Sequence, residues 1–461
     1  MQINHTMFRE YDLRGMESEE ELNPRTLELI GKGYGTFLLR RGINELVLGR
    51  DNRGSSEAFA QASLKGLLET GVDVIDIGVV TVPMLYWSQY HFQRKGGLMV
   101  TASHNPVGWN GVKLALGYSY TVIGKELEEI YDIITKEEFL SEGEGSVRSE
   151  DVQRAYVADI VKRVAIRKKM KVVVNTGNGT AGFIVPEVLR QAGCEVVEHY
   201  TESDPTFPRY TPNPAQVEMM EDTGAQVVKN GADVGFAFDA DGDRLGLVDE
   251  KGQNIWPDRY LILLSRLVLQ QEPGARIVFD VKCSQALEED IKAHGGIPVM
   301  WKTGHSYIKE KMKEEKAALA GEMSGHIFFQ QGYYGFDDAL FASLKLLEYF
   351  SQQENSVSEL IAQTPYYVSS PALHAPCPDE RKYEVVEHLT KEFKKEYEVI
   401  DINGARVLFG DGWGLVRASS NVPALVLRFE AKTEERLKEI EGIFREKLSK
   451  FPFVGKDWST A

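Results

Sequence analysis

Cysteine is scarce in this sequence, and its spacing argues against a disulfide framework and against a zinc cluster. The chain of 461 residues contains three cysteines, Cys194, Cys283 and Cys377, which lie far apart and form no CxxC pair. Disulfide scaffolds and structural zinc sites both depend on closely spaced cysteines. The pattern therefore favours a reducing compartment, and we expect a cytoplasmic protein.

Long apolar runs are missing as well. No segment approaches the about 18 consecutive apolar residues that a membrane-spanning helix needs. The start of the chain, MQINHTMFRE, lacks the apolar core of a signal peptide. We therefore expect a soluble protein without a membrane partner.

Positive charge is in deficit. The sequence has 53 Lys and Arg against 69 Asp and Glu, which gives a net charge of −16. Because an acidic body repels polyanions at long range, we expect no nucleic-acid partner. A small anionic substrate can still bind where cationic side chains line a local pocket, and the basic residues beside glycine-rich loops are the place to look.

The length and the order of elements predict several α/β domains. A chain of this size exceeds one hydrophobic core and fits three or four domains of about 100 to 150 residues. The same order of apolar strand, polar loop, helix, glycine and second strand occurs at 45–77, 172–197 and 277–301. We therefore predict three related α/β domains, each with a loop at the carboxyl end of a strand.

The last hundred residues predict a different, smaller unit. Four prolines between Thr364 and Glu380 disfavour a helix there and indicate a linker. Two apolar strands follow, at 414–416 and 424–429, and residues 437–448 have helical apolar spacing. This order is typical of an α+β domain.

Ser103 stands at the tip of a loop that follows the apolar strand 97–101, and Lys113 lies ten positions further on. The pair suggests a nucleophilic hydroxyl with a nearby base. A serine that only caps a helix or forms a turn is the alternative. Because no GxSxG elbow surrounds Ser103, acyl transfer is disfavoured. A serine that carries a phosphoryl group is the better interpretation.

Three aspartates, Asp239, Asp241 and Asp243, crowd the turn between two apolar strands at 234–238 and 245–248. Such a cluster suits a hard divalent cation, and Mg²⁺ meets phosphate oxygens at sites of this kind. A solvated acidic turn is the plain alternative. An EF-hand is excluded because its sixth position holds an arginine in place of glycine, and strands flank the loop.

Arg244 directly follows the aspartates. An arginine there can stabilise charge on a transferring phosphoryl group, or it can simply neutralise the carboxylates. A second possibility for the turn is that Asp239 itself is the nucleophile, as in phosphatases whose first strand ends in Asp-x-Asp-Gly. Those sequences continue differently, since Asp243 and Arg244 follow here.

Three further loops carry weaker signals. Glu322 and Ser324 are two apart, so on an extended segment both would face one side and could bind adjacent sugar hydroxyls; a chance turn is the alternative. Residues 302–305, Lys-Thr-Gly-His, follow a strand and offer a cation and an imidazole. Residues 417–421, Arg-Ala-Ser-Ser-Asn, join two strands and offer groups that suit a phosphate.

Taken together, these loops resemble the α-D-phosphohexomutase family, and most closely its bacterial phosphomannomutase/phosphoglucomutase members. The resemblance covers the whole chain, from residues 8–15 (FREYDLRG) to the loop at 417–419. It implies four domains around a central cleft, three mixed α/β sandwich domains and a smaller α+β C-terminal domain. We place them at 1–148, 149–249, 250–364 and 365–461.

The resemblance also implies a role for each loop residue. Ser103 would carry the phosphoryl group and, with Asp239, Asp241 and Asp243, hold Mg²⁺. Lys113 and His326 would share the acid and base roles, in an order left open, and Arg244 would steady the transferring group. Asn421 departs from the family pattern, which often has Asn-Thr after Arg-Ala-Ser. The implied substrate-binding residues are Tyr11, Arg14, His104, Lys282, Gly304, His305, Glu322, Ser324, Arg417, Ser419 and Asn421.

The activity implied by the resemblance is the interconversion of hexose 1-phosphate and hexose 6-phosphate, with mannose, glucose or both as the sugar. It would proceed through a phosphoserine and a hexose 1,6-bisphosphate, with Mg²⁺ as cofactor and glucose 1,6-bisphosphate as activator. Small sugar phosphates would be the partners, and the chain would be a monomer, with a dimer as the alternative.

Other functions stay open at this point. They are a phosphoglucosamine mutase, a Mg²⁺-dependent sugar phosphatase that uses Asp239, and a sugar-phosphate sensor without turnover. A mutase must bind its bisphosphate in two poses. A grip on O3, O4 and the distal phosphate serves both, so we expect tolerance at C2. Met323 in Gly-Glu-Met-Ser-Gly resembles the hexose enzymes.

Overall fold

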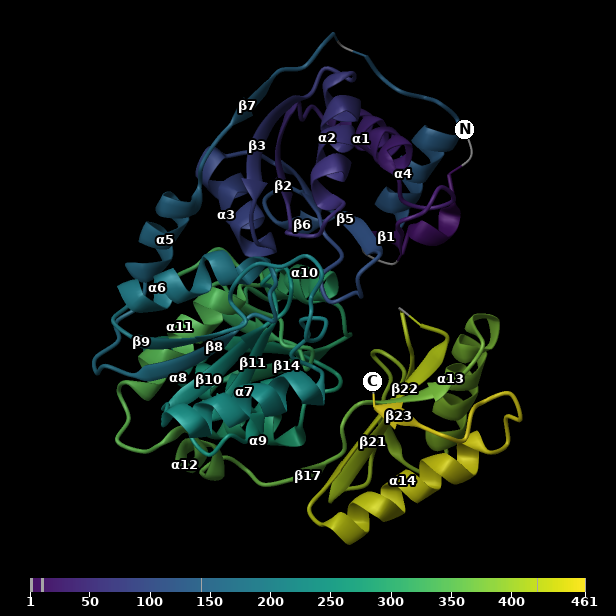
Figure 1. Ribbon diagram of the computed structural model, residues 1–461. Helices are drawn as coiled ribbons and strands as arrows, with labels where there is room; N and C mark the ends of the chain where they lie inside the picture. The colour runs from purple at the N-terminus through teal and green to yellow at the C-terminus, as the bar shows by residue number, and fades with distance from the viewer. Residues whose placement is uncertain (1–2, 10–11, 142, 421, 461) are drawn as a thin grey trace. The chain divides into compact units, whose positions relative to one another are not determined.

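The chain forms two compact units (Figure 1). The first unit contains Met1–Leu264 and Ser324–Leu360, and the second contains Ser265–Met323 and Ile361–Ala461. Among the described residues, no helix combines the length and apolar character that crossing a membrane requires. The computed structural model describes residues 3–9, 12–141, 143–420 and 422–460.

The first unit begins with a mixed sheet in the order β1-β5-β4-β2-β3-β7, with β6 paired to β5. Strands β4, β2, β3 and β7 are parallel, whereas β5 runs antiparallel to both β4 and β1. The strands are β1 (Leu13–Met16), β2 (Glu45–Arg50), β3 (Asp73–Val79), β4 (Gly96–Val100), β5 (Trp109–Leu116), β6 (Tyr120–Thr121) and β7 (Val147–Ser149).

Helices cover both faces of this sheet. The core cluster joins α1, α2 and α4 to Leu46, Leu48 and Leu98 on one face of the sheet. The α3 helix packs on the other face, where a Cβ at Gly49 would meet Leu85 (Figure 1). The helices are η1 (His5–Met7), α1 (Pro24–Leu39), α2 (Ser56–Leu68), α3 (Val82–Phe92) and α4 (Lys125–Thr135).

A second sheet of the first unit has the order β12-β11-β10-β8-β9. Strands β9, β8 and β10 are parallel, and β11 turns back antiparallel on β10 with Phe238 opposite Leu245. That tight reversal holds the aspartate loop. The strands are β8 (Lys171–Asn175), β9 (Glu195–His199), β10 (Val234–Phe238), β11 (Leu245–Asp249) and β12 (Asn254–Ile255). The helices are α5 (Gln153–Val161), η2 (Thr180–Phe183), α6 (Val185–Gln191) and α7 (Val217–Asn230).

The chain leaves the first unit along α8 and returns to it after β15. The returning segment contains β16, whose Phe328 bridges Asp337, and α11, which Asp338 caps by accepting a hydrogen bond from the Phe341 amide at 2.8 Å. These elements are α8 (Pro257–Gln271), β16 (Ile327–Phe329), α11 (Ala339–Phe350) and α12 (Val357–Ala362).

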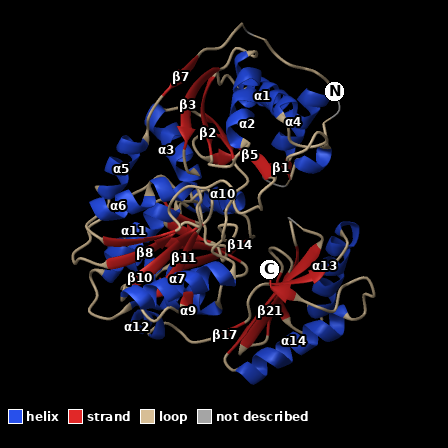
Figure 2. Cartoon of the chain, viewed as in Figure 1, coloured by secondary structure: helices blue, strands red, loops and turns tan. Residues whose placement is uncertain are grey.

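The second unit combines a parallel sheet with the C-terminal sheet. Strands β14, β13 and β15 are parallel neighbours. The C-terminal sheet has the order β19-β20-β21-β22-β18-β23, with β17 on β22, and α13 and α14 share its core cluster (Figure 2). The elements are β13 (Arg276–Asp280), α9 (Gln285–Ala293), β14 (Ile297–Trp301), α10 (His305–Glu315), β15 (Leu319–Gly321), β17 (Val368–Ser369), β18 (Leu373–Pro376), α13 (Asp379–Phe393), β19 (Glu398–Ile400), β20 (Ala405–Leu408), β21 (Gly412–Ala418), β22 (Ala424–Ala431), α14 (Glu434–Leu448) and β23 (Ser459–Thr460).

The three predicted strand–loop–helix–strand segments are confirmed as β2-α2-β3, β8-α6-β9 and β13-α9-β14. The linker predicted at 364–380 is wrong in part, because β17 and β18 lie inside it and pair with β22. Proline did exclude a helix there. It is compatible with β18 because Pro376 is the last residue of that strand, where a missing amide hydrogen costs the ladder least.

Helices α1 and α2 touch through glycines. A Cβ at Gly66 would lie 2.1 Å from the carbonyl oxygen of Glu28, and one at Gly31 would lie 2.3 Å from that of Ser63. Real Cβ atoms do not approach backbone so closely, so the absence of side chains fixes the spacing of the two helices.

Replacing Gly66 with alanine should lower the midpoint of thermal unfolding, because an added methyl group in a packed contact costs about 1 to 3 kcal/mol. Gly442→Ala in α14 is the matched control, since nothing lies within 4 Å of a Cβ built there. The control should raise the midpoint slightly, because alanine is the better helix former. Calorimetry of both variants decides, and an unchanged midpoint for Gly66→Ala would contradict this close packing.

Candidate active site

The serine predicted to carry the chemistry sits directly after β4 in a buried, strained position. Ser103 has φ of 48° and is 1 % exposed. A left-handed conformation costs a residue other than glycine about 1 to 3 kcal/mol and tends to occur at functional sites. The Ser103 hydroxyl donates to Asp239 Oδ2 at 2.9 Å and lies 3.1 Å from His104 Nδ1. The strained backbone thus aims the hydroxyl at the aspartate loop.

The three aspartates of the loop converge as predicted. Asp239, Asp241 and Asp243 are completely buried, and each offers an oxygen that lies within 4.8 Å of the others. Gly242, with φ of 75°, permits the tight turn. Oδ1 of Asp239 accepts from the amides of Asp243 and Arg244, both at 3.1 Å. The loop backbone therefore orients its own carboxylates toward one point.

Lys113, on β5, supplies the compensating charge. Its Nζ lies 3.1 Å from Asp241 Oδ2 and 2.5 Å from Asp243 Oδ2. Burial by itself lowers the pKa of Lys113, but the two carboxylates outweigh it and hold the pKa well above its ordinary value. These contacts favour the protonated form of Lys113, and the acid or base role predicted for it beside Ser103 stays a prediction.

The aspartates respond unequally to this arrangement. Burial, together with Asp243 and Asp241, holds the pKa of Asp239 well above its ordinary value. Burial also raises the pKa of Asp243, but the neighbouring Lys113 and His326 overcome that effect and lower it. Within the described part of the chain, Oδ1 of Asp241 has no hydrogen-bond donor. The site thus keeps an acceptor oxygen in place for a cation.

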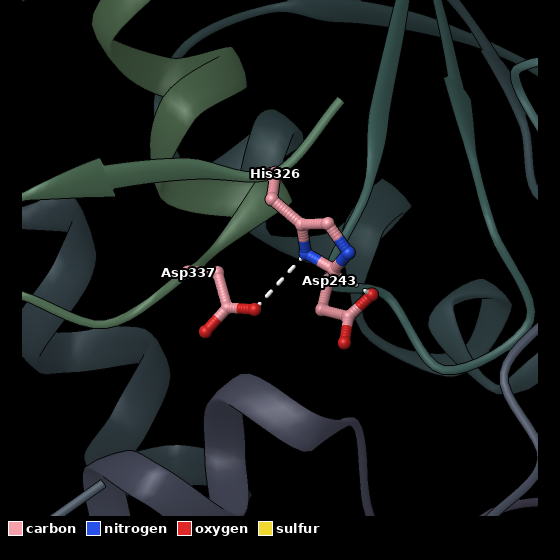
Figure 3. Close-up of side chains that lie close together, drawn as sticks. All are labelled: Asp243, His326 and Asp337. Atoms are coloured by element: carbon pink, nitrogen blue, oxygen red, sulfur yellow. Dashed lines mark ion pairs between the residues drawn. The ribbon is translucent and has the colours of Figure 1, made fainter. Parts of the chain in front are cut away.

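His326 lies beside the carboxylates of Asp337 and Asp243 (Figure 3), and Arg244 contacts the same ring. Arg244 Nε donates to His326 Nε2 at 3.0 Å, and Nδ1 lies 3.0 Å from Asp337 Oδ2 and 3.7 Å from Asp243 Oδ1. An arginine can only donate, so Nε2 must be the acceptor and Nδ1 carries the proton toward Asp337. This arrangement makes Nε2 the basic atom of the ring.

Two more predicted residues adjoin the serine loop. Arg14, on β1, donates to Asp12 Oδ2 at 2.7 Å and to Asn105 Oδ1 at 2.6 Å. Burial, with the guanidinium groups of Arg244 and Arg14, holds the pKa of His104 well below its ordinary value, so this ring is neutral. Tyr11, predicted to bind substrate, lies outside the described residues.

In the second unit, predicted residues gather at the carboxyl ends of the parallel strands. Asp280, the last residue of β13, lies 3.3 Å from Lys282 Nζ and accepts from Thr303 Oγ1 at 2.9 Å. Glu322 Oε1 accepts from the Gly304 amide at 2.6 Å, directly before His305, which begins α10. Lys282, Gly304, His305 and Glu322 therefore belong to one corner of that sheet.

The extended segment predicted for Glu322 and Ser324 is wrong. Strand β15 ends at Gly321, and the chain turns at Met323 and Ser324. Gly325, with φ of 98°, follows, and its carbonyl accepts from the Leu245 amide at 3.0 Å. The alternation that holds in a strand cannot be applied to a turn, so residues two apart need not share a face.

Cationic side chains also surround the loop of residues 417–420 in the C-terminal sheet. Arg417 is 6 % exposed at the end of β21, and its Nε has no hydrogen-bond acceptor among the described residues. Lys382, on α13, donates to the carbonyl oxygen of Ser419 at 2.5 Å. Two cations thus hold and flank the loop predicted to bind phosphate. Asn421 lies outside the described residues.

Comparison with known proteins places the chain. A phosphomannomutase/phosphoglucomutase of Pseudomonas syringae pv. tomato is 41% identical over 446 residues, covering 96% of this chain and 95% of the relative. The chain belongs to the phosphoglucomutase/phosphomannomutase family. Its models match at residues 5–141 (alpha/beta/alpha domain I), 154–252 (domain II), 256–367 (domain III) and 373–447 (C-terminal domain).

Other members agree with this membership. A phosphoglucomutase of Neisseria gonorrhoeae is 38% identical over 456 residues, covering 98% of both chains. The crystal structure of a phosphoglucomutase/phosphomannomutase family protein from Burkholderia thailandensis superposes with a TM-score of 0.92 at 37% identity, covering 97% of this chain and 98% of that one. The predicted family and the four-domain α/β fold are confirmed. The central cleft and the domain boundaries stay predictions.

Sequence reasoning missed two buried aspartates that organise this family member's loops. Asp337 contacts His326, and Asp280 contacts Lys282 and Thr303. The position of Asp280 at the end of an apolar strand could have identified it as a candidate site residue. The sequence around Asp337 gives no such indication. A carboxylate just before an apolar helix normally indicates a helix cap, and its neighbour Asp338 fills that role.

Lys113→Met should lower the free energy of unfolding by about 3 to 5 kcal/mol at neutral pH, because it leaves buried carboxylates uncompensated. Because the pKa of Asp243 is lowered in the folded protein, this carboxylate stabilises the wild type at pH values above the ordinary aspartate pKa. The difference in free energy of unfolding between the two proteins should therefore shrink as pH falls. Urea denaturation at two pH values measures this.

Lys65→Met is the control for that experiment. Its ion pair with Glu28 lies in solvent, so the change should be small at both pH values. Equal losses for the two lysine variants would contradict a compensating role for Lys113.

Proposed function

We propose that this protein is a phosphohexomutase that interconverts hexose 1-phosphate and hexose 6-phosphate, with mannose and glucose as sugars. The observation that carries the proposal is the contact of the Ser103 hydroxyl with Asp239 at 2.9 Å, inside the aspartate cluster. The relatives named phosphomannomutase/phosphoglucomutase and phosphoglucomutase support it along the whole chain.

The reaction would pass the phosphoryl group through Ser103. A sugar hydroxyl attacks the phosphorus of phosphorylated Ser103, the bond from phosphorus to Oγ breaks, and the hexose 1,6-bisphosphate forms. After the bisphosphate changes pose, Oγ attacks its other phosphorus, the bond from that phosphorus to the sugar oxygen breaks, and the isomeric hexose monophosphate leaves while Ser103 regains a phosphoryl group. The strained backbone at Ser103 supports this role because it keeps Oγ facing the aspartates.

The protonation of two side chains suggests how the acid and base roles divide. Nε2 of His326 accepts a hydrogen bond from Arg244, so this atom suits the base that takes the proton of the attacking hydroxyl. Lys113 is protonated beside Asp241 and Asp243, so it suits the acid. Arg244 donates to His326 through Nε and lies 3.9 Å from Asp239 Oδ2, so its charge suits the stabilisation of a transferring phosphoryl group.

Mg²⁺ fits the aspartate cluster. Asp239, Asp241 and Asp243 offer converging oxygens, two of which, Oδ1 of Asp241 and Oδ1 of Asp243, have no hydrogen-bond donor in the described part of the chain, and Ser103 Oγ adjoins them. When bound, the ion would neutralise charge on the phosphoryl oxygens. Glucose 1,6-bisphosphate as activator is part of the same proposal, since it would load Ser103.

The loops of the second unit suit the rest of the substrate. Lys282 lies beside Asp280, and Glu322, which binds the Gly304 amide next to His305, has a carboxylate that can accept from sugar hydroxyls. Arg417 with Ser419 suits a phosphate. Ser324 is also a proposed sugar-binding residue. Tyr11, Arg14, His104, Gly304 and Asn421 complete the proposed substrate-binding residues.

Two alternatives are disfavoured. A phosphatase that uses Asp239 as nucleophile conflicts with its contacts, because Oδ1 accepts from two amides, Oδ2 accepts from Ser103, and its pKa is raised. A phosphoglucosamine mutase finds no support in the names of the relatives described above. A cytoplasmic location, a monomer or a dimer, and the lack of nucleic-acid and membrane partners stay predictions from sequence.

The decisive measurement is a coupled assay with glucose 1-phosphate and mannose 1-phosphate, primed with glucose 1,6-bisphosphate and Mg²⁺. Ser103→Ala should lose on the order of 10³-fold or more in rate, because the phosphoryl carrier is gone. Intact mass should show about 80 Da on wild-type Ser103 and none on the variant. Ser146→Ala, at an exposed site, is the control. Product with neither sugar would refute the proposal.

Mg²⁺ should raise the unfolding midpoint, and this gain should grow as pH rises above the ordinary aspartate pKa. Asp239 has a raised pKa and must lose its proton to bind the ion, so affinity grows as pH rises. At 100 times the dissociation constant the gain is about 2.7 kcal/mol. EDTA should reverse it. The same gain in Asp239→Asn would count against this site.

A further inference from the structure

Arg53 contacts a large part of the serine loop. It lies between β2 and α2 and is 4 % exposed. Its Nη2 donates to the carbonyl oxygens of Ser103 at 2.7 Å and Asn105 at 2.6 Å, and its Nη1 donates to those of Pro106 at 3.0 Å and Trp109 at 3.2 Å. One guanidinium thus binds the backbone of the segment 103–109 from its first residue to its last.

Arg53 is itself held in place. Asp51, completely buried, lies 3.3 Å from Arg53 Nε through Oδ2, and its Oδ1 accepts from the Arg53 amide at 3.0 Å and from Ser56 Oγ at 2.5 Å. The Phe207 ring lies 5.2 Å from the guanidinium carbon. The Asn110 side chain, beyond the loop, donates to Ser56 Oγ at 3.0 Å. These contacts hold the Arg53 side chain in place independently of its hydrogen bonds to the loop.

The serine loop needs such support because its own backbone provides little. Ser103 is in the strained left-handed conformation, and residues 103–108 form neither helix nor strand, whereas Trp109 begins β5. The local hydrogen bonds of residues 103–108 include a turn from the Asn105 amide to the Ala102 carbonyl at 3.0 Å. An unsupported loop with a strained residue would relax and carry Oγ away from Asp239.

We propose that Arg53 is a positioning residue, whose guanidinium fixes the backbone of the segment 103–109 so that Ser103 Oγ keeps facing Asp239 with and without a phosphoryl group. This inference rests on the proposed function of Ser103. A phosphoryl group adds about −1.5 to −2 charge to the loop, and a guanidinium stays charged beside it. Lysine has no planar fork to bridge several carbonyls, so it is a poor replacement.

The test compares Arg53→Met and Arg53→Lys with wild type. Arg53→Met should lower kcat about 100-fold, as expected when a reacting group is displaced by about 1 Å. KM for the sugar phosphate should stay within about twofold, because the Arg53 guanidinium binds backbone carbonyl oxygens of the loop and none of the side chains proposed to bind substrate. Arg53→Lys should recover part of kcat.

Two further readouts separate positioning from general stability. Hydrogen exchange of peptides covering 103–109 should quicken in Arg53→Met while exchange in β10 and β11 stays at the wild-type rate. Arg50→Met is the matched control. Arg50 is the last residue of β2, close to Arg53 in the sequence, and it pairs with the solvent-exposed Glu57 at 3.3 Å. The control should keep kcat within about twofold and leave exchange in the loop unchanged.

The outcomes are distinct. Wild-type kcat or wild-type loop exchange in Arg53→Met would overturn the positioning role, as would a lysine variant indistinguishable from wild type. If Arg53→Met does not fold, Arg53→Lys decides by the same exchange measurement, where unchanged protection overturns the role. Full activity of Ser103→Ala would instead refute the proposed function, while loop exchange would still judge Arg53 by itself.

Discussion

Burying three aspartates in one turn imposes a charge balance that the first unit must satisfy. A buried carboxylate without a partner costs several kcal/mol, so the strands β10 and β11 could not hold this turn by themselves. The compensation comes from the other sheet of the unit, where Lys113 on β5 pairs with Asp241 and Asp243, and Thr101 donates to Asp241 at 3.0 Å. Ser103, which donates to Asp239, therefore lies where the contacts of the two sheets compensate the buried aspartates.

The balance also sets the chemistry of the neighbouring groups. Two carboxylates hold the pKa of Lys113 well above its ordinary value, whereas Nε2 of His326 accepts a hydrogen bond from Arg244. Asp337 Oδ2 lies 3.0 Å from the other ring nitrogen, Nδ1. Under the proposed mechanism, these partners would give Lys113 and His326 complementary acid and base roles.

A buried guanidinium that binds carbonyl oxygens occurs in both units. In the second unit, Arg406 is completely buried and donates from Nη1 to the carbonyls of Val281 and Cys283, both at 2.7 Å, on either side of Lys282. Arg428 donates to the carbonyl of Lys282 itself. Arg53 does the same under Ser103. Loops that carry functional groups have few backbone hydrogen bonds of their own, and arginine, with five donors in a fixed fork, supplies the missing ones.

The alternation of apolar and polar residues along the chain determined most of the local structure. Strand–loop–helix–strand segments were predictable because apolar spacing and glycine stops are local, and the positions of Ser103 and the aspartates at strand ends followed from them. The β17 and β18 strands were not predictable, since they exist only by pairing with β22, and prolines concealed them.

By itself, the order of residues determined the family, the α/β class and the loops that carry chemistry, because these depend on residue type and on neighbours along the chain. Only the tertiary structure decided that Lys113 is a protonated counter-charge, that Asp337 orients His326, and that Arg53 supports Ser103. Each of these depends on contacts between residues far apart in sequence, which no local pattern records.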